Sequence, residues 1–198
     1  MARIFLHHGL GNLRPVEHWQ HRTAIALRKL GHQVAYPQFP SPDSPDIAKW
    51  QQLLVAEIEQ LVELGDEAGE LIYIGHSLGA LSFFQAVKDG VLPGNFDRTL
   101  LVAPADPELL PDLPVGQLAT GLSAIRGAVF ESAGQLTIVA SDSDQWLPRG
   151  VHATFGDPLD VTPIVIAGAK HFSALDGWGP WQGVIDWVLD PSADLTRR

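Results

Sequence analysis

The run Leu71-Ile72-Tyr73-Ile74-Gly75 passes directly into His76-Ser77-Leu78-Gly79, so a β-rich segment ends in the pentapeptide Gly-His-Ser-Leu-Gly. The apolar run predicts a buried strand, and the residues from Ala80 to Lys88 carry the apolar spacing of a helix. A tight turn between a strand and a helix lifts a serine hydroxyl above the sheet. Gly75 and Gly79 lack a Cβ, which permits the close chain approach that such a turn needs. These features predict a nucleophile elbow with Ser77 at its tip.

The helix that follows Ser77 adds a second chemical feature. Its first amides have no partner within the helix, and its dipole presents a partial positive charge at that end. Both would face a negative charge that develops on an oxygen beside Ser77. The pentapeptide alone also fits an ordinary glycine-rich turn, so the functional interpretation depends on partners elsewhere in the chain.

The rest of the sequence alternates between short apolar runs and segments with helical periodicity. Continuous β-rich runs such as Leu136–Ala140 are typical of strands buried on both faces, as in a parallel sheet covered by helices. Six strands are expected, at Arg3–His8, Gln33–Tyr36, Leu71–Gly75, Thr99–Ala103, Gln135–Ala140 and Ile164–Ala167. Helices are expected at His18–Leu30, Pro45–Leu64, Leu78–Asp89 and Trp178–Leu189.

This alternation predicts one doubly wound α/β domain over residues 1–190, with six mostly parallel strands and helices on both faces. Residues 191–198 are expected to form a frayed tail. Asp106–Gly134 is less regular and rich in Pro, Leu and Gly, and it fits either a loop that roofs the site or a connector with a short helix. No segment is long enough for a large helical cap.

Composition excludes several classes of protein. The chain has 198 residues, 45% of them hydrophobic and 18% charged, which describes a globular rather than a disordered protein. Its formal net charge of −10, without a Lys or Arg cluster, argues against a nucleic-acid partner. No apolar run approaches the roughly 20 residues that span a bilayer. There is no cysteine and no signal-peptide pattern at the start, so the expected location is the cytoplasm. The oligomeric state is not indicated.

A serine nucleophile needs a base, and His171 has the best position for one. In α/β-hydrolases the catalytic residues follow in the order Ser, acid, His, each after a strand. His171 comes just after the last expected strand, at Ile164–Ala167. The other seven histidines fit this order less well, and His76 lies within the elbow itself.

The acid should follow the preceding strand, and two carboxylates do so. Asp144 stands four residues before Pro148, a common arrangement in this fold, and it is the favoured candidate. Asp142 is the alternative, although its side chain also suits capping of its own loop. Asp106, which follows the strand at Thr99–Ala103, is a third and weaker candidate.

Two backbone amides are expected to bind the oxyanion. One is the amide of Leu78, directly after the nucleophile, and the other comes from the loop after an earlier strand. His8-Gly9-Leu10-Gly11 ends the first strand and offers the amide of Leu10. The alternative is a glycine turn that only connects a strand to a helix.

These pieces together resemble the small, uncapped α/β-hydrolases of the retinoblastoma-binding-protein-like serine hydrolase family. The elbow is generic to that fold, whereas its combination with the other motifs is specific and covers nearly the whole chain. The resemblance implies Ser77, Asp144 and His171 as a catalytic triad. The matching motifs are His8–Gly11 with His18-Trp19, Pro45-Asp46 with Trp50, Gly75–Gly79, Leu101–Asp106, and His171–Ala174 with Gly177–Trp181.

The chain departs from the family pattern at several positions. Lys170 stands where the family usually has a glycine before its catalytic histidine, and either perturbs the base or points outward. Where the family usually has an Asp-Pro pair at the acid, this chain has Asp144-Gln145. The sequence of Arg149–Thr162 predicts a poor helix, whereas relatives usually have a good helix between the acid and the histidine. A chain without cysteine lacks the Leu-x-Cys-x-Glu segment of the vertebrate namesake, so no retinoblastoma-type partner is carried over.

The leading functional hypothesis is acyl transfer from a small-molecule ester, thioester or amide to water, with no metal or organic cofactor. Trp146 and Trp178 are expected near the acid and the base, where they fit either an apolar pocket wall or the core. Two alternatives stay open: a catalytically silent binding protein on the same scaffold, and diversion to a non-hydrolytic reaction such as perhydrolysis.

Overall fold

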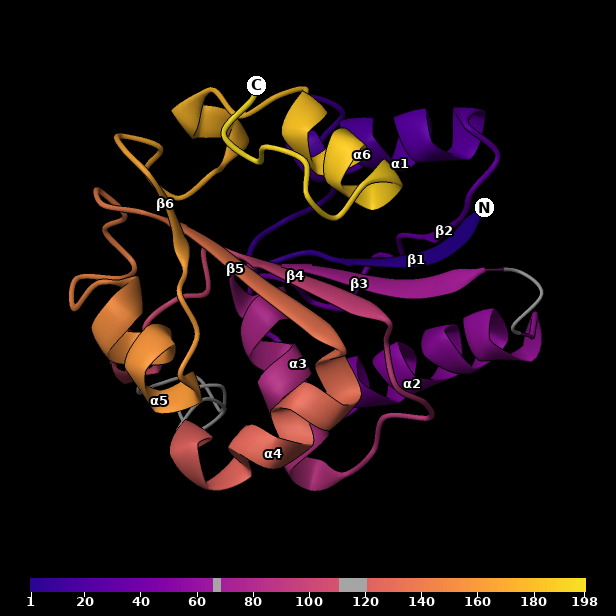
Figure 1. Ribbon diagram of the computed structural model, residues 1–198, viewed down its shortest axis with the longest axis horizontal. Helices are drawn as coiled ribbons and strands as arrows, with labels where there is room; N and C mark the ends of the chain where they lie inside the picture. The colour runs from indigo at the N-terminus through magenta and orange to yellow at the C-terminus, as the bar shows by residue number, and fades with distance from the viewer. Residues whose placement is uncertain (66–68, 111–120) are drawn as a thin grey trace.

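The computed structural model describes residues 1–65, 69–110 and 121–198 (Figure 1). Six parallel strands form one sheet in the order β2-β1-β3-β4-β5-β6. The strands are β1 (Ala2–His7), β2 (Gln33–Ala35), β3 (Glu70–His76), β4 (Arg98–Val102), β5 (Gln135–Ser141) and β6 (Ile164–Ile166). All six expected strands are present, within one residue of their expected bounds.

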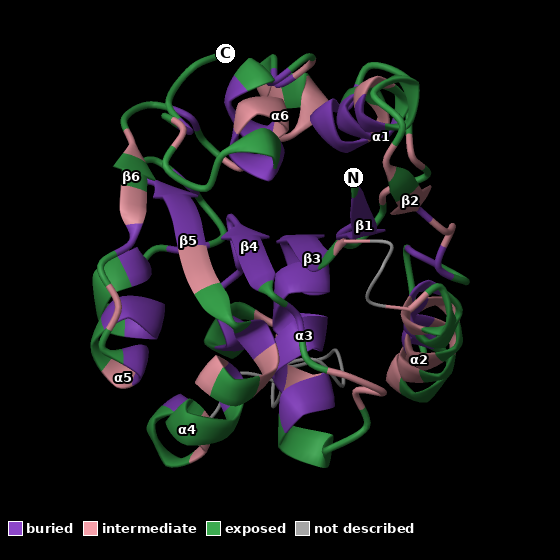
Figure 2. Ribbon diagram, turned by 45° about the vertical axis from the view of Figure 1, so that its right-hand side comes forward, coloured by how far each residue is buried: buried purple, intermediate pink, exposed green. Residues whose placement is uncertain are grey.

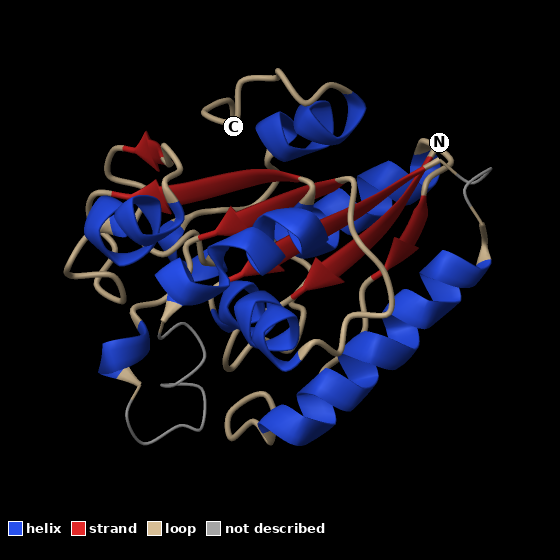
Figure 3. Cartoon of the chain, turned by 60° about the horizontal axis from the view of Figure 1, so that its bottom comes forward, coloured by secondary structure: helices blue, strands red, loops and turns tan. Residues whose placement is uncertain are grey.

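Helices cover both faces of this sheet (Figure 1). α1 and α6 lie on one face, and α2 to α5 lie on the other. Figure 3 shows α2 as the longest helix, and it packs against β1, β2 and α3. The helices are α1 (Trp19–Lys29), α2 (Ile47–Glu63), α3 (Leu78–Asp89), α4 (Leu122–Ala133), α5 (Asp157–Leu159) and α6 (Gln182–Leu189).

The order of the strands creates a crevice between β1 and β3. β1 leads into α1 on one face of the sheet, and β3 leads into α3 on the opposite face. The chain segments that leave the carboxyl ends of these neighbouring strands therefore diverge. Open α/β sheets bind ligands at such a switch point. In this protein the loop after β1 and the turn that holds Ser77 lie at the switch point.

Successive side chains of the strands point to opposite faces of the sheet, and a hydrophobic core lies on each face. Phe5 and Tyr73 pack toward α2 and α3, whereas Ile4 and Ile72 pack toward Trp19 of α1 on the other face. Figure 2 shows the central strands buried and the outer sides of the helices exposed. Burial on both faces explains why these strands have continuous apolar sequences.

Several local expectations differ from the structure. α6 begins at Gln182 rather than at Trp178, because Pro180 disfavours helical geometry at the residue before it. The region expected to be a poor helix does form one, as a π-helical segment at His152–Gly156 that continues into α5. Pro158 lies at the start of α5, directly after the π-helical segment.

The segment Asp106–Gly134 contains a 3-10 turn at Pro107–Leu109 and the regular helix α4. A roof over the site is one of two expectations for Asp106–Gly134, and residues 111–120 of that segment lie outside the described residues. The tail after Asp190 contacts the start of α6: Leu195 is buried, and its carbonyl oxygen accepts a hydrogen bond of 2.9 Å from Nε1 of Trp181.

Candidate active site

Ser77 lies at the turn between β3 and α3 in a strained backbone conformation, with φ 54° and ψ −117°. Its amide donates to the carbonyl oxygen of Val102 at 2.9 Å, which ties the turn to the end of β4. A Cβ at Gly79 would collide with the carbonyl oxygen of His7, so only glycine allows α3 to start this close to β1. Strain of this kind persists only where the surrounding structure enforces it, as it does at functional sites.

Two buried hydrogen bonds of the Tyr73 hydroxyl stabilise the turn. The hydroxyl of Tyr73 donates to the carbonyl oxygen of Gly79 at 2.7 Å and lies 2.6 Å from Nδ1 of His7. The hydroxyl has one proton, so it accepts from His7, whose Nδ1 carries the hydrogen. Burial, followed by the neighbouring His8, lowers the pKa of His7 well below 6.5, and the ring stays neutral.

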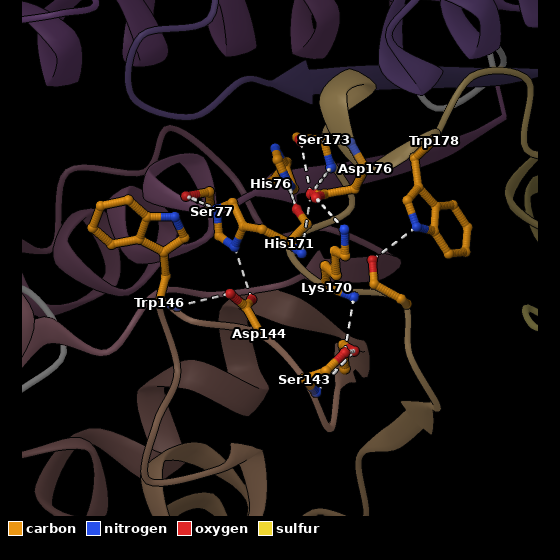
Figure 4. A network of polar contacts seen from close by, with 12 residues as sticks. His76, Ser77, Ser143, Asp144, Trp146, Lys170, His171, Ser173, Asp176 and Trp178 are labelled. Carbon is orange, nitrogen blue, oxygen red and sulfur yellow. Dashed lines mark hydrogen bonds and ion pairs between the residues drawn. The ribbon is translucent and has the colours of Figure 1, made fainter.

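His171 lies between Ser77 and Asp144 (Figure 4). Its Nε2 is 2.9 Å from Oγ of Ser77, and its Nδ1 is 2.8 Å from Oδ2 of Asp144. The carboxylate fixes the tautomer: Nδ1 carries the proton and donates to Asp144, so Nε2 is free to accept the hydroxyl proton of Ser77. Of the sequence-predicted residues, the structure thus brings these three together.

The other two acid candidates have different partners. Oδ1 of Asp142 accepts the amide of Gly168 at 2.8 Å, so Asp142 caps the loop after β6 rather than its own loop. Asp106 is buried and forms a bidentate ion pair with Arg149, with both hydrogen bonds at 2.6 Å. Neither carboxylate is bonded to His171.

Three consecutive residues after β5 hold the loop after β6. Besides the bonds of Asp142 and Asp144, Oγ of Ser143 accepts the amide of Lys170 at 3.3 Å. Because β5 and β6 are adjacent parallel strands, their loops leave the same edge of the sheet and lie side by side. This set of contacts positions the backbone that carries His171.

Lys170 adopts φ 54°, in the left-handed region that favours glycine. This backbone conformation is consistent with the glycine that the family pattern usually has at this position. The side chain points outward, with 65% exposure, and its Nζ lies 3.9 Å from Asp176. Burial opposes the charge on Asp176, but hydrogen bonds from Ser173 and the amide of His171, and the charge of Lys170, lower its pKa below 3.8.

His76 is a site residue to which the sequence analysis assigned no role. Its Nε2 donates to the carbonyl oxygen of His171 at 2.9 Å, as Figure 4 shows. Burial, followed by the charges of His171 and His18, lowers its pKa well below 6.5. The only sequence signal for this contact is the position of His76 next to Ser77, and that position does not identify a partner 95 residues away.

The loop after β1 lies against Ser77, as expected for an oxyanion-binding segment. A Cβ on Gly9 would lie 2.8 Å from Cβ of Ser77, so glycine is required at this contact. The hydrogen bonds found among the described residues include none donated by the amide of Leu10 or of Leu78.

His8 anchors this loop. Its Nε2 accepts the amide of Phe39 at 2.9 Å and lies 3.1 Å from Nε2 of Gln38, which also donates to the carbonyl oxygen of Asn12. Burial first, and then the charge of Arg14, lower the pKa of His8 from 6.5 to about 4, against the opposing effect of its bond to Gly9. The segment after β2 thus holds the loop that carries Leu10.

Ser77 and His171 line two neighbouring cavities. The larger has a volume of about 450 Å³ and runs between the loops after β1 and β6. The smaller, of about 120 Å³, is lined by apolar side chains including Leu78, Ala105 and Trp146. Leu10 lines both cavities. The residues that line them include no Asp, Glu, Lys or Arg, so the described walls suit uncharged groups.

The two tryptophans expected near the site have different positions. Trp146 is 40% exposed, lines the smaller cavity, and lies with its ring centroid 6.3 Å from that of His171. Trp178 is buried, and its Nε1 donates to the carbonyl oxygen of Ala169. Figure 4 shows them on opposite sides of His171. Trp146 is a wall residue, whereas Trp178 belongs to the core.

Within the described residues, no three His, Asp or Glu side chains are grouped so that they could hold a metal ion. In the same part of the chain, no helix is long and apolar enough to cross a membrane. The expectations that no cofactor is needed and that the location is cytoplasmic stay predictions.

Comparison with known proteins gives one family match. A profile described as serine hydrolase matches residues 4–189. No match was found among curated protein sequences.

Solved structures with the same fold cover nearly the whole chain. The ydeN gene product from B. subtilis has 19% identity and a TM-score of 0.74, over 96% of this chain and 97% of that chain. A putative YdeN-like hydrolase from Pectobacterium atrosepticum has 22% identity and a TM-score of 0.63, over 94% and 88%. Est1E from Butyrivibrio proteoclasticus has 16% identity and a TM-score of 0.58, over 96% and 87%. At these identities, the similarity establishes the fold.

Proposed function

This chain belongs to the serine hydrolase family and has the α/β-hydrolase fold, and we propose that it cleaves a small carboxylic ester, thioester or amide through an acyl-enzyme on Ser77. The observation that carries the proposal is the pair of contacts at His171, 2.9 Å from Oγ of Ser77 and 2.8 Å from Oδ2 of Asp144. Residues 1–190 are the unit proposed to carry the activity.

In the first step, Oγ of Ser77 attacks the substrate carbonyl carbon while Nε2 of His171 accepts the hydroxyl proton. Asp144 stabilises the imidazolium that forms and holds its orientation through the bond to Nδ1. The carbonyl π electrons move to the oxygen, and the tetrahedral intermediate carries a negative charge there. The amides of Leu10 and Leu78 would bind that oxyanion and contribute about 3 kcal/mol each.

Collapse of this intermediate breaks the bond to the leaving group, which takes the proton from Nε2 of His171. Water then repeats the sequence on the acyl-enzyme: His171 accepts a proton from water, the hydroxide attacks the carbonyl, and Ser77 leaves with that proton. The acid product diffuses out. Water is the only co-reactant of the second half-reaction.

The test is labelling with a fluorophosphonate probe, followed by a panel of acyl esters, thioesters and aminoacyl amides. Native protein should be labelled and Ser77→Ala should not. Ser82→Ala is the matched control, since Ser82 is a buried serine of α3 whose hydroxyl donates to the carbonyl oxygen of Leu78. Failure of the native protein to label would favour the silent binding protein over the enzyme.

A further inference from the structure

The inference concerns His18, which stands at the amino-terminal end of α1 and lines the larger cavity beside Ser77. Its side chain is only 4% exposed, and its Nδ1 accepts the backbone amide of Gln20 at 3.2 Å. The ring therefore caps α1 with one nitrogen. The polar atom that it can present to the cavity is the other nitrogen, Nε2.

The cap determines where the proton of His18 resides. A backbone N–H only donates, so Nδ1 must be the unprotonated nitrogen of a neutral ring, and the hydrogen is on Nε2. Burial, followed by the charges of His8 and His171, lowers the pKa of His18 from 6.5 to about 4, so the ring is neutral at pH 7. His18 thus offers an uncharged N–H donor, and the hydrogen bonds of the described residues include none from this atom.

Two neighbouring polar side chains of the same wall, His76 and Ser173, already form hydrogen bonds within the protein. Nε2 of His76 donates to His171, and Oγ of Ser173 donates to Asp176 at 2.7 Å. The ring centroid of His18 is 5.3 Å from that of His76, which in turn is 5.2 Å from that of His171. The donor therefore lies close to the reacting groups but is not one of them.

Asn12, whose Oδ1 accepts the amide of Arg14 at 2.6 Å, is a further polar residue of this cavity. The remaining lining residues are glycine, alanine, proline and leucine, and the cavity opens to solvent at a leucine rim. Leu13 is 68% exposed and Leu175 is 99% exposed, and both line the cavity. A buried carboxylate or phosphate would find no cationic side chain among the residues that line it, and an unpaired buried charge is costly. A mainly apolar group with one neutral acceptor oxygen fits these walls.

We propose that Nε2–H of His18 is a specificity determinant that binds an uncharged acceptor oxygen on the arm of the substrate in the larger cavity. The acceptor is an ether, hydroxyl or carbonyl oxygen separate from the carbonyl that Ser77 attacks. This inference rests on the proposed hydrolysis at Ser77, and it adds the class of substrate: an uncharged, mainly apolar acyl compound with one further oxygen on that arm.

The test compares butyl pentanoate with two analogues in which an ether oxygen replaces the penultimate methylene, butyl 3-methoxypropanoate for the acyl arm and 2-methoxyethyl pentanoate for the alcohol arm. One hydrogen bond contributes enough to change kcat/KM by about three- to tenfold. In the native enzyme, at least one oxa-ester should exceed its all-carbon parent by that factor. In His18→Asn, where the shorter side chain keeps an acceptor for the amide of Gln20 but has no Nε2, the ratio should fall to about one.

His18→Phe is the second variant, because it keeps an aromatic ring beside Trp19 and removes both nitrogens. Its ratio should also be about one. A ratio of about one for both analogues in the native enzyme, or a raised ratio that persists in His18→Asn, would overturn the proposal.

Binding to Ser77→Ala separates this inference from the proposed function. The same ester pairs are titrated by calorimetry into Ser77→Ala and into Ser77→Ala with His18→Asn. Absence of turnover in the native enzyme contradicts hydrolysis, and the calorimetry still decides the role of His18. Tighter binding of an oxa-ester that is lost with His18→Asn supports it, whereas equal binding, or none, overturns it.

Discussion

Nε2 of His76 donates a 2.9 Å hydrogen bond to the backbone carbonyl oxygen of His171. His76, the neighbour of Ser77 in the sequence, therefore holds the backbone of the histidine that contacts Ser77. The two histidines lie at the carboxyl ends of β3 and β6, strands that are three places apart in the sheet. The contact spans the site and fixes one side of the His171 loop. The loop after β5 fixes the other side through Asp142, Ser143 and Asp144.

We expect His76→Phe to lower kcat by about 10- to 100-fold with little change in KM, because a displacement of His171 by about 1 Å reduces the rate by a factor of this size. His76→Gln keeps an N–H donor and should recover part of the loss. The measurement is steady-state kinetics beside urea unfolding, which separates misplacement from instability. A native kcat in His76→Phe would contradict the positioning role.

Asp144→Asn and Asp142→Asn form a matched pair. Asp144→Asn should lower kcat about 10⁴-fold, because the amide favours the wrong imidazole tautomer and no longer stabilises the cation. Asp142→Asn keeps an Oδ1 acceptor for the amide of Gly168 and should retain most of the activity. Ester hydrolysis by the two purified variants checks this. Equal losses would mean that Asp142 has a catalytic part that its contacts do not indicate.

Tyr73→Phe should lower the free energy of unfolding by about 1–3 kcal/mol, because it leaves the carbonyl oxygen of Gly79 and Nδ1 of His7 buried without their partner. Tyr36→Phe is the control. The Tyr36 hydroxyl is also buried, but it has no hydrogen-bond partner among the described residues. Its removal should be neutral or stabilising in urea unfolding. Equal effects of the two changes would show that the Tyr73 bonds contribute nothing net.

The free energy of unfolding should fall as the pH drops from 6.5 to about 4. The pKa values of His8 and His18 are lowered from 6.5 to about 4, and those of His7 and His76 well below 6.5, in each case mainly by burial. Within this window the unfolded chain therefore binds protons that the folded protein excludes. Each histidine then contributes a slope of roughly 1.4 kcal/mol per pH unit, and the stabilisation is complete only above pH 6.5. Urea unfolding at pH 7, 6 and 5 measures this slope, and His18→Asn should remove the contribution of one of these histidines. A free energy independent of pH between 7 and 5 would contradict the assignment.

Lys170→Gly should raise the free energy of unfolding by up to about 1 kcal/mol, since the left-handed backbone at φ 54° strains a residue with a Cβ. Lys170→Ala keeps the strain and should bring no gain. The exposed contact with Asp176 at 3.9 Å contributes little and does not change this order. Thermal or urea unfolding of both variants provides the comparison, and a less stable Gly than Ala variant would be inconsistent with strain at this residue.

The sequence predicted all six strands closely because buried parallel strands carry continuous apolar runs. Its errors arose where local signals conflict. The Pro and Gly residues in Arg149–Thr162 argued against a helix, yet a π-helical segment and α5 form there. Near the carboxyl terminus, the apolar pattern begins at Trp178, but α6 begins only at Gln182, after Gly179-Pro180.

The sequence by itself determined the elbow around Ser77, because strand, glycines and helix are contiguous and their preferences are local. It also narrowed the acid to Asp144, Asp142 and the weaker candidate Asp106, and the base to His171 after β6. Only the tertiary structure decided between Asp142 and Asp144, since both follow the same strand and the lateral register of two loops selects which carboxylate meets Nδ1 of His171. The same holds for His18 and His76. Their contacts depend on how the ends of β1, β3 and β6 converge, and distances between strand ends are set by packing of the whole sheet rather than by local sequence.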